Sequence, residues 1–206
     1  MAGRETALKV ILLGNGRVGK TSIVQRYITG HFDSRQPSTI QAACVQKSLL
    51  VNGKKVALTI WDTAGQERFH SMAAVYYRQT DGALLVFDLT DADSLTRVKQ
   101  WVRELHKMVG DDVILTICGN KADLVGQRQV SRKQGEAYAS SAGAVYFETS
   151  AMTDQGITEA FLSTTQRVVA AKALQGDDAA EEDDDFGLTV NWDEEVEPEQ
   201  GGKCKC

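Results

Sequence analysis

Apolar residues follow two different spacings along the first 175 positions of this 206-residue chain. Short, mostly apolar runs typical of β-strands alternate with longer segments in which apolar residues recur every three or four positions, as on one face of a helix. The strand-like runs cover residues 7–13, 42–51, 54–62, 82–89, 113–120 and 144–150. The helix-like segments begin near Lys20 and then cover 69–79, 93–109, 131–143 and 157–174.

The order of these segments predicts a doubly wound α/β domain. Several strand-like runs are apolar throughout, which is typical of parallel strands whose two faces are both covered by helices. Asn52-Gly53 stands between two strand-like runs and is a hairpin signal, so one strand pair at an edge of the sheet is predicted to be antiparallel. We therefore expect a six-stranded, mostly parallel sheet with helices on both faces. Ligands of such domains bind in a crevice at the carboxyl ends of the strands.

Charge divides the chain into two regions near Gln175. The net charge of −5 combines a body with 16 acidic and 21 basic residues and a tail with twelve acids and only two bases, Lys203 and Lys205. A tail of this composition is too charged to bury a hydrophobic core of its own. We predict a globular domain at 1–175 and a disordered acidic segment at 176–206.

Cysteine usage and hydropathy restrict the class of protein. Cys44 and Cys118 lie in strand-like runs and are expected to be buried thiols, since four scattered cysteines make no disulfide framework. No apolar run approaches the ~18 residues of a membrane-spanning helix. Arg4, Glu5 and Lys9 stand where a signal peptide would have its apolar core. We therefore expect a cytosolic chain.

The segment GNGRVGKT, residues 14–21, matches the pattern of a phosphate-binding loop between a strand and a helix. Backbone N–H groups of such a loop and of the helix N-terminus converge on an anion. Lys20 then meets the terminal phosphates, and the Thr21 hydroxyl can bind Mg²⁺. The alternative is a turn that uses glycine for its positive φ angles. The predicted phosphate-binding residues are Asn15, Gly16, Val18, Gly19, Lys20, Thr21, Ser22, Thr39 and Gly65.

A second motif, WDTAGQERF, begins where the third strand-like run ends. Asp62 occupies the position of the Mg²⁺-side acid of a P-loop enzyme, although an acidic helix cap is the alternative. The backbone N–H of Gly65 can approach a γ-phosphate because no side chain intervenes. The neutral amide of Gln66 can orient a water molecule for in-line attack. The loop segment PSTI adds a further hydroxyl, and the predicted Mg²⁺ ligands are Thr21, Thr39 and Asp62.

The motif GNKAD indicates which base is bound. Asp123 can accept two hydrogen bonds from the N1–H and exocyclic amine of guanine, and adenine has no such pair of donors on that edge. Asn120 is expected to hold neighbouring loops together, and the stem of Lys121 can lie along the base plane. In the motif ETSA, the backbone N–H of Ala151 can donate to guanine O6. Either tetrapeptide alone could be a turn, but their order after the phosphate loop favours a guanine site that also includes Ser150.

Residues 7–174 resemble the Rab family of the Ras superfamily, whose signatures are similar to WDTAGQERF, YYRQTDGALLVFDLT, GNKADL and ETSA. QERFHSMAAVYYR and VKQWVRELHKMVG look most like the endosomal Rab five and Rab twenty-one group. The resemblance implies a P-loop small GTPase domain that slowly hydrolyses GTP to GDP and phosphate and acts as a molecular switch. It implies that switch I lies around 32–44 and switch II around 64–77. It also implies that Phe32 stacks edge-on against the guanine and that Gln66 assists hydrolysis.

The same resemblance implies a set of partners: effectors, an exchange factor, a GTPase-activating protein, the Rab escort protein and the GDP dissociation inhibitor. It implies a monomer, with no nucleic-acid partner, that acts in endosomal vesicle trafficking. The location expected is the cytoplasmic face of endosomal membranes, with cycling through the cytosol. The effector surface is expected at Cys44, Trp61 and Tyr76, although the family usually has Phe in place of Cys44. Gln41 and Met152 also depart from the family, which usually has Gly and Lys there.

The acidic tail carries two short patterns. Apolar residues alternate within its acidic run, at Phe186, Leu188, Val190 and Trp192. They are either incidental residues of a solvated tail or a linear motif similar to the one by which Rab tails engage the escort protein. The final CKC resembles the ending on which Rabs receive two geranylgeranyl groups. The alternative, a metal-binding pair, is a poor site without a His or a third Cys nearby, so we predict lipidation at Cys204 and Cys206.

Two other classes of protein stay open. A metabolic P-loop ATPase or kinase is disfavoured by the NKAD motif, and a nucleotide-selectivity assay distinguishes it. A module that holds GTP without turnover is disfavoured by Gln66, and a measurement of single-turnover phosphate release distinguishes such a module from a GTPase.

Overall fold

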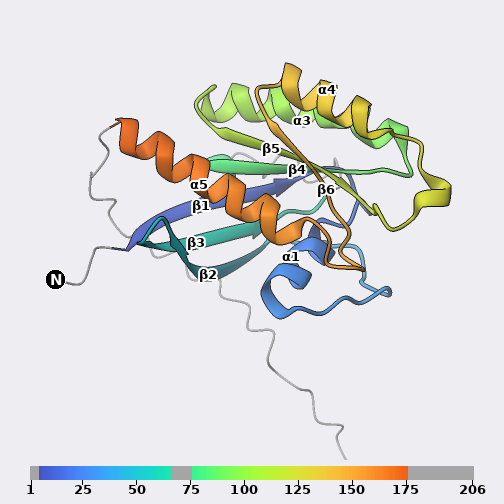
Figure 1. The fold of residues 1–206 in the computed structure, drawn as a ribbon, viewed down its shortest axis with the longest axis horizontal. Helices are drawn as coiled ribbons and strands as arrows, with labels where there is room; N and C mark the ends of the chain where they lie inside the picture. Colours follow the sequence, from blue (N-terminus) through green and yellow to red (C-terminus); the bar gives the residue numbers. More distant parts are fainter. Residues whose placement is uncertain (1–4, 66–75, 176–206) are drawn as a thin grey trace, which may run out of the picture.

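The computed structural model describes residues 5–65 and 76–175, which contribute six strands to one sheet (Figure 1). The strands are β1 (Thr6–Leu13), β2 (Ala43–Val51), β3 (Lys54–Asp62), β4 (Gly82–Asp88), β5 (Ile114–Asn120) and β6 (Val145–Glu148). The helices are α1 (Lys20–Thr29), α3 (Ala92–Val109), the 3-10 turn η2 (Val125–Gln127), α4 (Arg132–Ser141) and α5 (Ile157–Gln175). The predicted helix at 69–79 lies mostly outside the described residues, as does the whole predicted tail at 176–206.

The strand order is β2-β3-β1-β4-β5-β6, and every pairing is parallel except that of β2 with β3. Asn52 and Gly53 connect this antiparallel pair with φ angles of 51° and 77°. Two consecutive residues at positive φ are characteristic of the tight hairpin turn that suits the right-handed twist of strands. The predicted fold, with its antiparallel edge pair, is therefore confirmed.

Helices cover both faces of the sheet, with α1 and α5 on one face and α3 and α4 on the other (Figure 1). On the first face, the rings of Tyr27 and Phe161 stack with their centroids 4.0 Å apart. On the second face, Val98 and Leu105 of α3 are fully buried against the sheet. Strand β4 lies between these two layers and is buried along its whole length, which explains its continuous apolar sequence.

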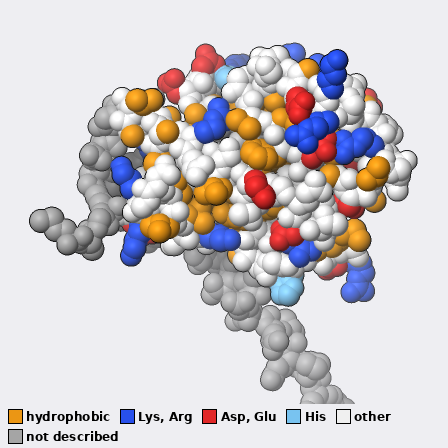
Figure 2. Space-filling view, in the orientation of Figure 1, with side chains coloured by type: hydrophobic (Ala, Val, Ile, Leu, Met, Phe, Trp, Pro, Cys, Tyr) orange, Lys and Arg blue, Asp and Glu red, His pale blue; other side chains and the backbone are white. Residues whose placement is uncertain are grey.

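The surface over α5 and the hairpin mixes side chains of all kinds. Figure 2 shows basic and acidic side chains interspersed there with apolar ones. On this face, the basic side chains are therefore spread out rather than gathered into one patch. Within residues 5–65 and 76–175, no helix has the length and apolarity needed to cross a bilayer.

The topology places the sequence motifs at one edge of the sheet. Strands β1, β3, β5 and β6 run parallel to one another, and each motif begins at or directly after the carboxyl end of one of them. Since parallel strands end at the same edge, four loops that are far apart in sequence meet there. This is the edge on which the candidate site is built.

Candidate nucleotide-binding site

The loop between β1 and α1 requires glycine at two positions. Gly14 and Gly19 have φ angles of 141° and 95°. A Cβ atom on Gly14 would lie 2.1 Å from the carbonyl oxygen of Val86, and one on Gly19 would lie 2.4 Å from the side-chain amide nitrogen of Asn120. Helix α1 begins directly after Gly19, which supplies no side-chain cap. The N–H groups at the start of the helix are therefore directed at the loop, where they can receive a phosphate.

Lys20 lies beneath this loop and is only 4% exposed. Its Nζ donates to the carbonyl oxygens of Gly14 and Asn15, at 2.7 and 2.9 Å. Burial lowers the pKa of this ammonium group to about 8, although the charge of Asp62 acts in the opposite direction. An anion beside Nζ would favour the charged form, because it offsets the loss of hydration. Lys20 is thus placed to bind the terminal phosphates of a nucleotide.

The three predicted Mg²⁺ ligands come together from separate elements. The hydroxyl oxygens of Thr21 and Thr39 are 2.6 Å apart. Asp62, at the end of β3, is 3% exposed, and its buried Oδ1 has no hydrogen-bond partner among the described residues. Burial raises the pKa of this carboxyl group, while the Thr21 hydroxyl and the Lys20 charge lower it. A buried carboxylate oxygen without a partner, next to two hydroxyls, fits a small divalent cation that prefers oxygen ligands.

The backbone of Gly65 packs directly against the phosphate loop. A Cβ atom at this position would lie 2.4 Å from both the Lys20 Nζ and the backbone carbon of Asn15. Glycine is therefore needed to bring the main chain of the DTAG segment to the place where Lys20 would meet a phosphate. The predicted catalytic residue Gln66 lies outside the described residues.

Asn120 joins three loops at the base end of the site. It is 2% exposed, and its Nδ2 donates to the carbonyl oxygen of Val18 at 2.8 Å. Its Oδ1 accepts from the hydroxyl of Thr149 at 3.3 Å. The GNKAD loop, the phosphate loop and the ETSA loop are thus connected through one buried amide, as the sequence predicted for Asn120.

Asp123 and Ser150 are hydrogen-bonded to each other, with the Ser150 hydroxyl donating to Asp123 Oδ1 at 2.5 Å. The Ser150 oxygen also accepts from the backbone N–H of Thr153. A two-way backbone bridge joins Ser150 to Gln155 and closes the ETSA loop. These contacts fix the Asp123 carboxylate beside Ala151, so that acceptors and a backbone donor for one base edge lie together.

Lys121 has a φ angle of 65°, which turns the chain sharply after β5. Its Nζ forms an ion pair of 2.6 Å with Asp88 at the end of β4. The ammonium group is therefore directed to the neighbouring strand. The aliphatic part of the side chain can lie along the cavity, which Lys121 helps to line.

These groups surround one cavity with a volume of about 370 Å³, within the range of small-molecule sites. Predicted residues that line it are Gly16, Gly19, Lys20, Thr21, Ser22, Phe32, Thr39, Gly65, Asn120, Lys121, Asp123 and Ala151. Predicted residues that act from behind the lining are Asn15, Val18, Asp62 and Ser150. Lining residues that the sequence did not predict include Arg17, Asp33, Ser34, Gln36, Pro37, Ser38 and Leu124. Each of these residues is next to or near a motif residue in sequence, and this proximity could have indicated that they line the cavity.

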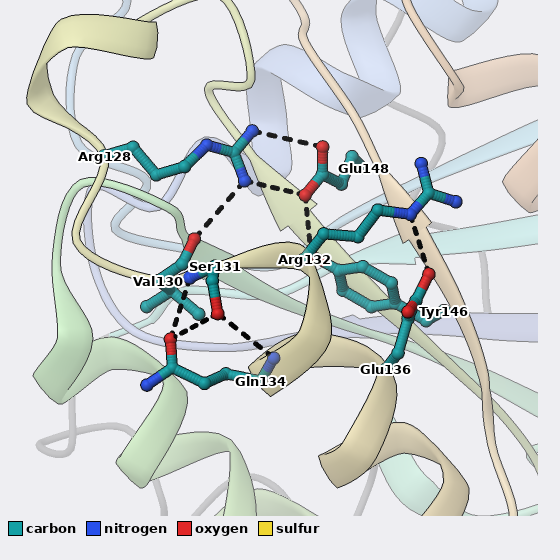
Figure 3. Close-up of polar contacts among 8 residues, drawn as sticks. All are labelled: Arg128, Val130, Ser131, Arg132, Gln134, Glu136, Tyr146 and Glu148. Atoms are coloured by element: carbon teal, nitrogen blue, oxygen red, sulfur yellow. Dashed lines mark hydrogen bonds and ion pairs between the residues drawn. The ribbon is translucent and has the colours of Figure 1, made fainter.

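The end of β6, just before the ETSA loop, is held by a polar network (Figure 3). Arg128 donates to both carboxylate oxygens of Glu148, at 2.7 and 3.1 Å, and also to the carbonyl oxygen of Val130. The Tyr146 hydroxyl donates to Glu148 at 3.4 Å. The Arg128 guanidinium lowers the pKa of Glu148. A bidentate pair of this kind is geometrically specific, so it fixes the strand from which the ETSA loop departs.

The predicted effector residues lie together near the β2 edge of the sheet, and all three are partly buried. Cys44 and Trp61 are direct partners in the β2–β3 pairing, so their side chains share one face. The rings of Trp61 and Tyr76 are 5.5 Å apart, and Lys9 Nζ lies 5.1 Å from the Trp61 ring. Cys118 is fully buried as predicted, but the expectation that Cys44 is buried was wrong. Cys44 is partly exposed, because β2 is an edge strand.

The fold and the cavity together define a P-loop nucleotide-binding domain. A glycine-dependent phosphate loop, a buried lysine and a buried acid form one end of its cavity. A second set of loops from β5 and β6 forms the other end.

Comparison with known proteins gives the family. Residues 9–170 match the model of the Ras family. The chain is 50% identical to human Ras-related protein Rab-21 over 168 residues, which cover 82% of this chain and 75% of that protein. It is 48% identical to Rab-21 of Dictyostelium discoideum over 169 residues, 82% of this chain and 80% of that protein. It is 42% identical to Rab5A of rice over 183 residues, 89% and 87% of the two chains.

The chain therefore belongs to the Ras family, in its Rab branch, and is a GTPase that binds guanine nucleotide. The resemblance to the Rab five and Rab twenty-one group, drawn from short motifs, is confirmed over most of the chain.

Proposed function

We propose that this GTPase is a Mg²⁺-dependent switch that recruits effectors in endosomal vesicle trafficking. The observation that carries the proposal is the meeting of Thr39, from the switch I segment, with Thr21 of the phosphate loop at 2.6 Å. A loop that reaches the phosphate site through one hydroxyl can be held there by the γ-phosphate and its cation, and released when they leave. The names of the relatives, Rab-21 and Rab5A, support the endosomal assignment.

The proposed mechanism assigns a separate task to each part of the site. The phosphate-loop N–H groups and Lys20 hold the β- and γ-phosphates, while Thr21, Thr39 and Asp62 hold Mg²⁺. When bound, this ion offsets negative charge on the phosphates during transfer. Gly65 leaves room for its backbone N–H beside the γ-phosphate. Gln66, outside the described residues, orients the attacking water, and a GTPase-activating protein accelerates the slow intrinsic reaction.

At the other end of the cavity, the base is proposed to stack against Phe32, which lines the cavity and is 37% exposed. Asp123 accepts from two donors of guanine, and the backbone N–H of Ala151 donates to O6. Ser150 orients Asp123 through the 2.5 Å hydrogen bond. Asn120 fixes the two loops relative to the phosphate loop. This arrangement accounts for selection of guanine over adenine.

Membrane attachment is proposed to depend on the tail. Cys204 and Cys206, outside the described residues, carry two geranylgeranyl groups added with the help of the Rab escort protein. The GDP dissociation inhibitor then extracts the GDP-bound form, so that the protein cycles between cytosol and the cytoplasmic face of endosomes. Effectors bind the surface of Cys44, Trp61 and Tyr76, in which the Trp61 and Tyr76 rings already lie against each other.

The test is nucleotide exchange and single-turnover hydrolysis by the full chain. We expect GTP to displace a fluorescent GDP far better than ATP, and hydrolysis to require Mg²⁺. Thr21→Asn should bind GTP less tightly relative to GDP, because the altered side chain disturbs the cation site. Thr29→Asn is the matched control, since Thr29 lies in the last turn of the same helix, where its hydroxyl donates to the Gln25 carbonyl oxygen and accepts from the His31 N–H. Equal binding of ATP and GTP would refute the guanine site, and Mg²⁺-independent hydrolysis would refute the cation site.

A further inference from the structure

One arginine joins the base end of the cavity to the end of α1. Arg26 lies in the last turn of α1 and is half-buried. Its Nε donates to the carbonyl oxygen of Ala151 at 2.8 Å, and its Nη2 donates to that of Met152 at 3.0 Å. These acceptors are 125 and 126 residues away in the sequence. The contacts are therefore a tertiary connection between α1 and the ETSA loop.

The third donor of the same side chain acts on the chain that leaves α1. Arg26 Nη1 donates to the carbonyl oxygen of Gly30. Gly30 is the left-handed residue that ends α1, and its N–H donates back to the Arg26 carbonyl oxygen at 2.9 Å. Gly30 is thus held by both the side chain and the main chain of Arg26. Phe32, which lines the base end of the cavity, is only two residues further on.

The geometry of the ETSA loop explains why these contacts matter for the base. The Ser150 carbonyl accepts from the N–H of Gln155, which orients the peptide plane carrying the Ala151 N–H. Arg26 orients the next two carbonyls, at Ala151 and Met152. Ala151 is consequently fixed on both of its sides, and its N–H can keep one direction.

We infer that Arg26 is a positioning residue for the guanine site, acting on the Ala151 loop and on the Phe32 segment together. The guanidinium suits this task because it offers several donors in one rigid plane, and here Nε, Nη1 and Nη2 each meet a backbone carbonyl. The inference rests on the proposed guanine site, in which the Ala151 N–H donates to O6. It extends that proposal by giving α1, the helix that begins at the phosphate loop, a part in base recognition through Arg26.

The experiment measures dissociation of GDP and of 6-thio-GDP from the full chain. In 6-thio-GDP a weakly accepting sulfur replaces O6, while the two donors recognised by Asp123 remain. Arg26→Met removes all three donors but keeps an unbranched side chain, and we expect GDP to dissociate about tenfold faster, as for the net loss of a hydrogen bond from a charged group. The wild-type protein should release 6-thio-GDP faster than GDP, and in Arg26→Met this difference should shrink toward none.

Two further variants keep the test decisive. Arg26→Lys retains the charge with a single donor group, and its GDP dissociation rate should lie between those of the wild type and Arg26→Met. If the Met variant does not fold, the Lys variant should still release GDP faster than the wild type does. Arg132→Met is the matched control, because Arg132 is an exposed arginine of α4 that pairs with Glu136 on its own helix (Figure 3), and its GDP dissociation rate should equal that of the wild type.

The outcomes separate this inference from the proposed function. If the wild-type protein prefers guanine nucleotides but Arg26→Met releases GDP at the wild-type rate, the role of Arg26 is refuted and the guanine site is not. An unchanged ratio of the GDP and 6-thio-GDP rates in that variant also refutes it, since general destabilisation would speed both nucleotides equally. If the wild-type protein does not distinguish GTP from ATP, the guanine site itself is wrong.

Discussion

Replacing Asp123 with Asn should change the base that the site prefers from guanine to xanthine. Xanthine has the N1–H of guanine but carries an oxygen in place of the exocyclic amine. The Ser150 oxygen accepts from the Thr153 N–H at 3.1 Å, and its own proton is donated to Asp123 Oδ1 at 2.5 Å. An Asn side chain in this place keeps its oxygen toward Ser150, because that proton needs an acceptor. The amide nitrogen then takes the position of Oδ2 and faces the base.

The magnitude follows from the contacts that are exchanged. The amide nitrogen cannot accept from the exocyclic amine of guanine, so one hydrogen bond to a charged group is lost, worth roughly 1.5–3 kcal/mol. At about 1.4 kcal/mol for each factor of ten, GTP affinity should fall roughly 10- to 150-fold. The same nitrogen can donate to the xanthine oxygen. In the wild type, a carboxylate oxygen faces that xanthine oxygen, and the two acceptors repel each other. Affinity for xanthosine triphosphate should therefore rise.

The assay is competition of GTP and xanthosine triphosphate against a fluorescent nucleotide bound to the full chain. Asp91→Asn is the matched control, since Asp91 caps α3 by accepting from the N–H of Asp93 and does not line the cavity. This control should keep the wild-type preference for GTP. An Asp123→Asn variant with the same preference would remove Asp123 from the base site and refute the reasoning. If Ser150→Ala together with Asp123→Asn shows the same xanthine preference as Asp123→Asn alone, the proposed role of Ser150 in orienting the amide is wrong.

Three other predictions concern turnover, stability and membrane attachment. Gln66→Leu should slow GTP hydrolysis in single-turnover assays without weakening GTP binding, because water positioning acts on the transition state; unchanged hydrolysis with an activating protein present would contradict it. Glu148→Gln should lower the free energy of unfolding by roughly 1.5–3 kcal/mol at neutral pH, measured in urea at fixed GDP, because it weakens the bidentate pair with Arg128. Arg128 lowers the folded-state pKa of Glu148, so the stabilisation is fully present above the ordinary pKa of 4.5 and is lost as the pH falls through the lowered pKa. The free energies of unfolding of the wild type and the variant should therefore converge in acid. A difference between them that is constant with pH would refute the assignment. Replacing Cys204 or Cys206 by Ser should release much of the prenylated protein from liposomes in co-sedimentation, because one lipid chain anchors only marginally and two hold stably, and full retention by either single variant would contradict this.

Local sequence patterns were sufficient for the fold and for most of the site. Gly14 and Gly19 of the phosphate loop and the Asn52-Gly53 turn each encode a backbone conformation within a few residues, and the structure has positive φ angles at these positions. Parallel strands end at one edge, so motifs that follow β1, β3, β5 and β6 had to meet there once the strands were recognised. Positions of Lys20, Asp62 and Asp123 relative to the cavity could therefore be predicted from spacing alone.

Only the tertiary structure decided which side chains from distant segments touch. Arg26 reaches Ala151 and Met152 across about 125 residues, and nothing in its helical spacing distinguishes it from an ordinary solvent-exposed arginine. The partial exposure of Cys44 depends on the position of β2 at the edge of the sheet, which is set by the strand order and not by the apolar character of the strand. The sequence by itself determined the local backbone and the residue types at each strand end, because those depend on neighbours along the chain. The partners of long side chains depend on how helices pack over the sheet, and that packing is a property of the whole fold.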